Sequence, residues 1–148
     1  MNIHASAIGI IVAFAIIIYL KVSKAESHRY TYSLLLLTFP FYYFAFAIVA
    51  VDFEALAYES LFAVGFFIIA LCSIKLPDNA KFAWLAFGYF LHGLYDLFHN
   101  KFFINYGTPN WWPDFCAMVD IILGMYLIFL SIKALNVQPS KKHLSQTR

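Results

Sequence analysis

Five stretches of about 20 apolar residues follow one another along the chain, and they decide what it can fold into. An α-helix of this length crosses the hydrocarbon core of a bilayer and satisfies its own backbone hydrogen bonds there. The sequence therefore predicts an all-α fold, a compact bundle of five transmembrane helices in residues 1–135, with a polar tail at 136–148. The predicted spans are Ile3–Leu20, Tyr30–Val51, Ala55–Ile74, Ala80–Phe98 and Pro113–Leu135.

Composition supports a membrane protein. Hydrophobic residues make up 63% of the chain and charged residues only 12%, whereas soluble domains carry about 25% charged residues. The sequence contains no P-loop, dinucleotide fingerprint or nucleic-acid-binding stripe. We therefore expect the lipid bilayer as the main partner and no nucleic acid, and we leave open a homo-oligomer or a larger membrane complex.

All but one of the ten Lys and Arg residues fall on one side of this predicted topology. The exception is Lys101, between the fourth and fifth spans. Because cytoplasmic loops are enriched in Lys and Arg, we expect the amino terminus outside and the carboxyl terminus in the cytoplasm. An odd number of spans agrees with ends on opposite sides. We expect a multi-pass protein of the cell membrane, in the inner membrane of a bacterium.

Ionisable residues inside the predicted spans need an explanation, because each costs about 3 kcal/mol or more near the membrane centre. His92, Asp96 and His99 are spaced i, i+4, i+7, so they share one face of the fourth helix. Asp120 lies within the fifth span. Gly93, beside His92, leaves room for a neighbouring helix to approach.

If the helices are antiparallel, these residues lie at similar depths below the outer surface of the membrane. With a rise of about 1.5 Å per residue, His92 and Asp120 both lie roughly 12 Å below the outer surface. Glu59, in the third span, comes close to the level of Asp96. We therefore expect His92, Asp96, His99, Glu59 and Asp120 in one outward-facing layer of the bundle. Tyr42 and Tyr43, in the second span, could also face this layer, although aromatic packing is their favoured role.

Imidazoles and carboxylates in one layer are typical ligands of a divalent metal such as zinc. The predicted metal ligands are His92, Asp96, His99 and Asp120. A metal with three protein ligands keeps a position for water, which suggests hydrolysis of a lipid-like substrate. Asp96, Asp120 and Glu59 are the predicted catalytic carboxylates.

Two other interpretations of the same layer stay open at this point. A histidine flanked by carboxylates can relay protons, which would make the chain a proton or ion pathway component. The same groups can also tie helices together as ordinary hydrogen bonds, as in a structural subunit of a membrane complex. The sequence does not decide whether the protein is an enzyme.

The intramembrane His92, Asp96 and Asp120 are similar in residue type to the sites of membrane hydrolases related to alkaline ceramidases. Those proteins hold zinc among seven helices, in a different motif layout. This chain is shorter by two helices, and no residue role is carried over from that group.

Overall fold

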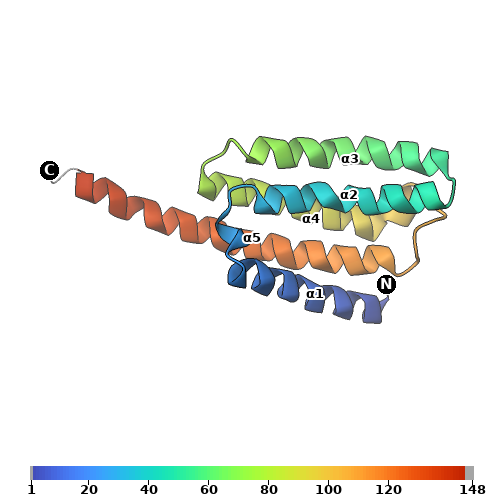
Figure 1. Ribbon diagram of the computed structural model, residues 1–148, viewed down its shortest axis with the longest axis horizontal. Coiled ribbons are helices and arrows are strands. Elements are labelled where there is room, and N and C mark those ends of the chain that lie inside the picture. The colour runs from blue at the N-terminus through green and yellow to red at the C-terminus, as the bar shows by residue number, and fades with distance from the viewer. Residues whose placement is uncertain (1, 146–148) are drawn as a thin grey trace.

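A computed structural model describes the backbone of residues 2–145 and the side chains of residues 2–136. Within this range the chain is all-helical and forms no strand, which confirms the predicted class. Figure 1 shows the long helices side by side in one bundle, with α5 extending beyond it toward the carboxyl terminus. The elements are α1 (Ile3–Val22), the short 3-10 helix η1 (Ala25–Ser27), α2 (Thr31–Val49), α3 (Phe53–Ser73), α4 (Asp78–Phe102) and α5 (Trp112–Ser145).

Four of the five long helices are long and apolar enough to cross a membrane. They are α1, α2, α3 and the Trp112–Asn136 part of α5. The exception is α4, predicted as a span at 80–98, because its buried ionisable residues lower its hydropathy. The 25 residues of α4 nevertheless form a helix about 37 Å long.

The exposed side of α4 is apolar, whereas the second half of its buried side is polar. Phe87 and Leu94 are exposed, whereas His92 and Asp96 are buried. This is the reverse of a surface helix in water, where the charged face is solvated and the apolar face is covered. Such a helix suits an apolar surrounding.

Several helix boundaries differ from the prediction. The fourth helix, predicted from Ala80, begins at Asp78 with Pro77 at the N-cap position, and it ends at Phe102 rather than Phe98. α5 continues to Ser145, so the segment predicted as a tail from residue 136 is helical that far. The last residues of that predicted tail, 146–148, lie outside the described range.

The helices pack in an order that differs from their order in the chain. α4 and α5 are antiparallel neighbours, as predicted, and α1 packs along α5 while α2 packs along α3 (Figure 1). α4 also contacts α3 and α2, so it touches every long helix except α1. Polar residues on α4 can therefore meet partners from three different helices.

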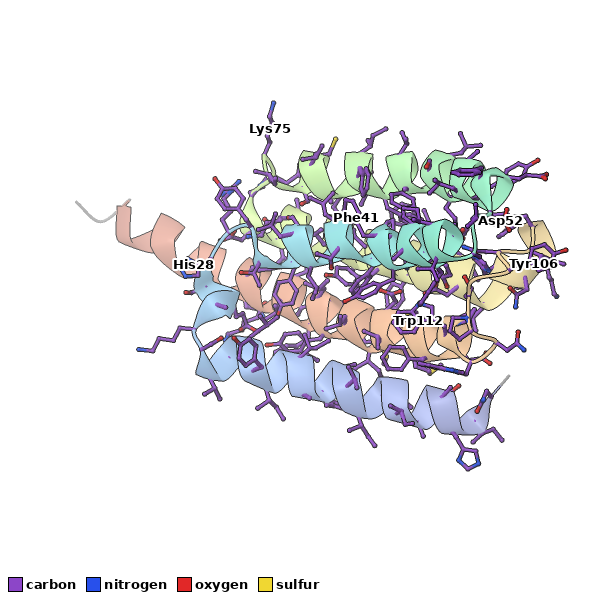
Figure 2. All side chains as sticks on the ribbon, turned by 45° about the vertical axis from the view of Figure 1, so that its right-hand side comes forward. His28, Phe41, Asp52, Lys75, Tyr106 and Trp112 are labelled. Carbon is purple, nitrogen blue, oxygen red and sulfur yellow. The ribbon has the colours of Figure 1, made fainter. Side chains whose placement is uncertain are left out.

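The two ends of the bundle differ in charge. The end with the α1–α2 connection and the α3–α4 turn holds every described Lys and Arg except Lys101, and we call it the basic end. The opposite end, with the α2–α3 turn and the α4–α5 loop, is called the acidic end. Figure 2 shows His28 at the basic end, and Asp52 and Tyr106 at the acidic end.

Close contact between α1 and α5 depends on Gly9. A Cβ atom at this position would overlap the Phe115 carbonyl oxygen, and it would lie 3.1 Å from Met118 Cβ. We expect Gly9→Ala to push α1 away from α5 and to lower the unfolding temperature in detergent. The matched control is Gly65→Ala on α3, where an added Cβ meets nothing within 4 Å. Alanine is also the better helix former there, so equal effects of the two substitutions would contradict this packing.

Candidate metal centre

Three buried side chains from α4 and α5 converge in the half of the bundle nearer the acidic end. His92 Nδ1 lies 2.8 Å from Asp120 Oδ2 and 3.4 Å from Asp96 Oδ2. Each of the three residues exposes at most 1% of its surface. One potential ligand atom from each lies within 4.8 Å of the other two. The predicted meeting of an α4 imidazole with an α5 aspartate is confirmed.

Gly93 lets α4 and α5 come close enough for this meeting. A Cβ atom on Gly93 would lie 3.1 Å from Asp120 Cβ and 3.2 Å from the Ala117 carbonyl oxygen. Those separations are tighter than ordinary van der Waals contact, and a larger residue would force the helices apart. His92 can therefore reach Asp120 because residue 93 has no side chain. Small residues at membrane helix interfaces allow such a close approach.

Tyr43 joins this group from α2. Its hydroxyl donates a hydrogen bond of 2.7 Å to Asp96 Oδ1. Its ring stacks on the His99 ring, with centroids 4.5 Å apart. The rings of Phe39 and Phe66 lie against His92, so the imidazole is packed among aromatic side chains. Tyr43 thus connects the first group to a second one.

Glu59, on α3, is the centre of this second polar group. Its Oε1 atom lies 2.8 Å from His99 Nε2 and accepts a hydrogen bond of 3.0 Å from Asn105 Nδ2. Its Oε2 atom accepts a hydrogen bond of 2.7 Å from the Tyr95 hydroxyl. Both carboxylate oxygens therefore have donors, and a protonated His99 would balance the charge.

The first group, His92, Asp96 and Asp120, differs because some of its carboxylate oxygens have no hydrogen-bond donor. Asp96 Oδ2 and Asp120 Oδ1 are buried and make no hydrogen bond; the 3.4 Å approach of His92 to Asp96 is an ion-pair contact only. Buried polar atoms are nearly always paired. Two carboxylates also face one imidazole, so with both carboxylates ionised the group is negative even when the imidazole is protonated. Burying an unbalanced charge is costly, and a divalent cation would balance a neutral imidazole with two carboxylates.

The structure divides the predicted site residues into these two groups. It brings His92, Asp96 and Asp120 together, and it places His99 beside Glu59, with Tyr43 between the groups.

Three residues that form hydrogen bonds in these two groups had little or no signal in the sequence. They are Tyr43, for which packing was favoured, Tyr95 and Asn105. Asn105 comes from the α4–α5 loop, whose path over the bundle no helical periodicity reveals.

A lateral groove leads from the apolar surface to the first group. It has a volume of about 490 Å³ and lies between α1 and α2, with α5 at its base. Its walls are mainly apolar, and Asp120 and Cys116 contribute to its lining. Trp111 and Trp112 line it at the acidic end, where Figure 2 places Trp112. The groove therefore borders Asp120, which is itself fully buried.

Comparisons of the chain with protein-family models, with curated proteins and with solved structures found no match. The role of the two groups must therefore be inferred from their own geometry.

Removal of the Tyr43 hydroxyl tests the connection between α2 and the first group. Tyr43→Phe deletes the one hydrogen bond that Asp96 Oδ1 accepts, and an unpaired buried group costs about 1–3 kcal/mol. We expect the free energy of unfolding in detergent to fall by about that amount. The neighbouring Tyr42 is half-exposed and packs against Trp112, so Tyr42→Phe is the matched control. A Tyr43→Phe variant as stable as Tyr42→Phe would count against the hydrogen bond.

Proposed function

We propose that this chain is an integral membrane protein that binds one divalent metal ion between His92, Asp96 and Asp120 and uses it to hydrolyse a lipid-like substrate. The observation that carries the metal site is the pair of buried carboxylate oxygens without donors, beside a buried imidazole. The neighbouring Glu59 group has a full set of donors and needs no cation.

The spacing of the three side chains suits a small ion such as Zn²⁺. Nitrogen and oxygen ligands lie about 2.0–2.2 Å from zinc, so two ligand atoms of a tetrahedral site are about 3.3 Å apart. His92 Nδ1 and Asp96 Oδ2 are already 3.4 Å apart. His92 Nδ1 and Asp120 Oδ2, at 2.8 Å, need to separate by about 0.5 Å to reach that spacing.

Three protein ligands leave a fourth position for water. A bound divalent ion would supply a hydroxide near neutral pH, because it lowers the pKa of its water. Asp120 Oδ1, which has no donor, would take the proton and return it to the leaving group, whereas Asp96 Oδ1 already accepts a hydrogen bond from Tyr43. Glu59 is the weaker candidate for that role, because three donors already hold its oxygens.

A lipid-like substrate is favoured by the lateral groove. Its apolar lining includes Ile8, Val12 and Leu35, and Asp120 lies on the same wall. A hydrocarbon chain can follow these residues directly from the bilayer, while its polar end reaches the carboxylates. A water-soluble substrate would gain nothing from that lining.

Metal content is the direct test of this function. We expect purified protein incubated with zinc and then desalted to hold about one zinc per chain by elemental analysis. His92→Ala and Asp120→Asn each remove a ligand and should lose most of the metal. His99→Gln should keep it, because His99 faces Glu59. Wild-type protein without metal, or His92→Ala with the wild-type content, would refute the site.

A proton or ion pathway is the second candidate, and Tyr43 is the observation that favours it. Through Tyr43, polar groups run from Asn105 in the α4–α5 loop to Asp120. Toward the basic end, however, the described core is apolar, with Leu36, Leu85 and Leu123 filling it. Proton flux into liposomes that depends on external pH and disappears in Asp120→Asn would favour this second function.

We also propose that α4 spans the membrane and that the acidic end faces outward. The apolar exposed side of α4 and the concentration of Lys and Arg at the basic end support this topology. Its polar side would then be shielded from lipid by α2, α3 and α5.

Labelling of single cysteines can test this orientation in a Cys72→Ala, Cys116→Ala background. Tyr106 and His28 are exposed residues at opposite ends of the bundle (Figure 2). We expect a membrane-impermeant maleimide to label Tyr106→Cys on intact cells, and His28→Cys only after permeabilisation. The reverse pattern would invert the topology, and labelling of both on intact cells would contradict a spanning bundle.

A further inference from the structure

A second cavity lies at the basic end, away from the metal centre. Its volume is about 780 Å³, and it lies between the end of α1, the α1–α2 connection, the α3–α4 turn and α5. Four cationic side chains line it: Lys21, Lys24, Arg29 and Lys133. We call this cavity the basic pocket.

The two carboxylates of the basic pocket already have partners. Glu26 Oε2 accepts hydrogen bonds from the Tyr32 hydroxyl at 3.0 Å and the Tyr126 hydroxyl at 2.6 Å. Asp78 Oδ1 pairs with Lys81 Nζ at 2.9 Å. Among the described side chains, none of the four lining cations forms an ion pair. Four cations and two carboxylates line the pocket, so its lining keeps an excess of positive charge.

Contacts between distant segments shape the wall of the pocket. Arg29 donates hydrogen bonds of 2.7 Å and 2.9 Å to the carbonyl oxygens of Ile74 and Leu76, which join the α1–α2 connection to the α3–α4 turn. Lys21 Nζ lies 5.0 Å from the centre of the Tyr126 ring on α5. The cations are thus brought together by the fold from two separate parts of the chain, residues 21–29 and α5.

The lining of the pocket is amphipathic. Phe82, Leu130 and Ala134 add an apolar surface from α4 and α5 beside the cationic side chains. The pocket also lies at the ends of helices that are apolar enough to cross a membrane, where lipid headgroups are found. A free phosphate ion would use only the cations, whereas a phospholipid would use both surfaces.

We propose that the basic pocket binds the phosphate headgroup of an anionic phospholipid. The phosphate oxygens take the positions between Lys21, Lys24 and Lys133, and the first methylene groups of the lipid cover Phe82 and Leu130. Basic pockets between transmembrane helices recognise anionic headgroups in this way. This site is independent of the metal centre.

Titration of a fluorescent phosphatidic acid into purified full-length protein in detergent tests the pocket. Each lost Lys near a headgroup weakens binding about fivefold, so Lys24→Gln with Lys133→Gln should raise the dissociation constant about 25-fold. The matched control is Lys75→Gln with Lys101→Gln, which removes the same charge outside the pocket and should leave the constant unchanged. Unfolding temperatures of both variants show that they are folded.

Two further binding measurements identify the class of ligand. We expect fluorescent phosphatidylcholine to bind far more weakly than phosphatidic acid, and millimolar sodium phosphate not to displace the lipid. An equal effect of the control variant, or equal binding of phosphatidylcholine, would overturn the proposal. Complete displacement by sodium phosphate would overturn the lipid assignment in favour of free phosphate.

Discussion

Two aspartate carboxylates share one imidazole in the buried interior of the bundle, and the need to give these polar groups partners constrains the arrangement of the helices around them. The polar side of α4 can be buried only if other helices supply partners for it. Asp120 comes from α5, Tyr43 from α2 and Glu59 from α3. Each partner fixes the rotation of its own helix against α4, so the polar groups specify a packing that apolar contacts alone would leave loosely defined.

The two polar groups illustrate the difference between a satisfied and an unsatisfied cluster. Glu59 has a donor on each oxygen, and a protonated His99 would balance its charge. It has the features of a structural element that holds α3 and the α4–α5 loop to α4. Asp96 and Asp120 instead each retain an oxygen without a hydrogen bond beside His92, and the proposed metal site rests on this feature. The difference in hydrogen bonding, rather than the residue types, assigns different roles to them.

The sequence predicts the helices and the centre of the site because both follow from short-range periodicity. The spacing of His92 and Asp96 places them on one face of a helix, and equal depth on antiparallel helices pairs His92 with Asp120. The sequence does not predict the hydrogen-bond partners of Glu59 and Asp96 in the same way. Tyr43 depends on how α2 is rotated, and Asn105 depends on the path of a loop. Neither property is written in a local pattern, because both are set by tertiary packing.

The two proposed sites divide the molecule between its ends. Near the acidic end, an apolar groove reaches buried carboxylates, which suits a molecule that enters sideways from the bilayer. At the basic end, unpaired cations surround an amphipathic pocket. An apolar core that includes Leu85 and Leu127 separates them. The fold thus keeps the proposed metal site in the interior of the bundle apart from the proposed headgroup site at its basic end.

X-ray absorption at the zinc edge of the loaded protein tests the central claim most directly, because it reports which atoms surround the ion. The account predicts one imidazole nitrogen and oxygen ligands at about 2.0–2.2 Å. Sulfur at about 2.3 Å would instead implicate Cys116, and two imidazoles would bring in a second histidine. Either result, or a zinc spectrum indistinguishable from the hydrated ion, would contradict a centre built from His92, Asp96 and Asp120.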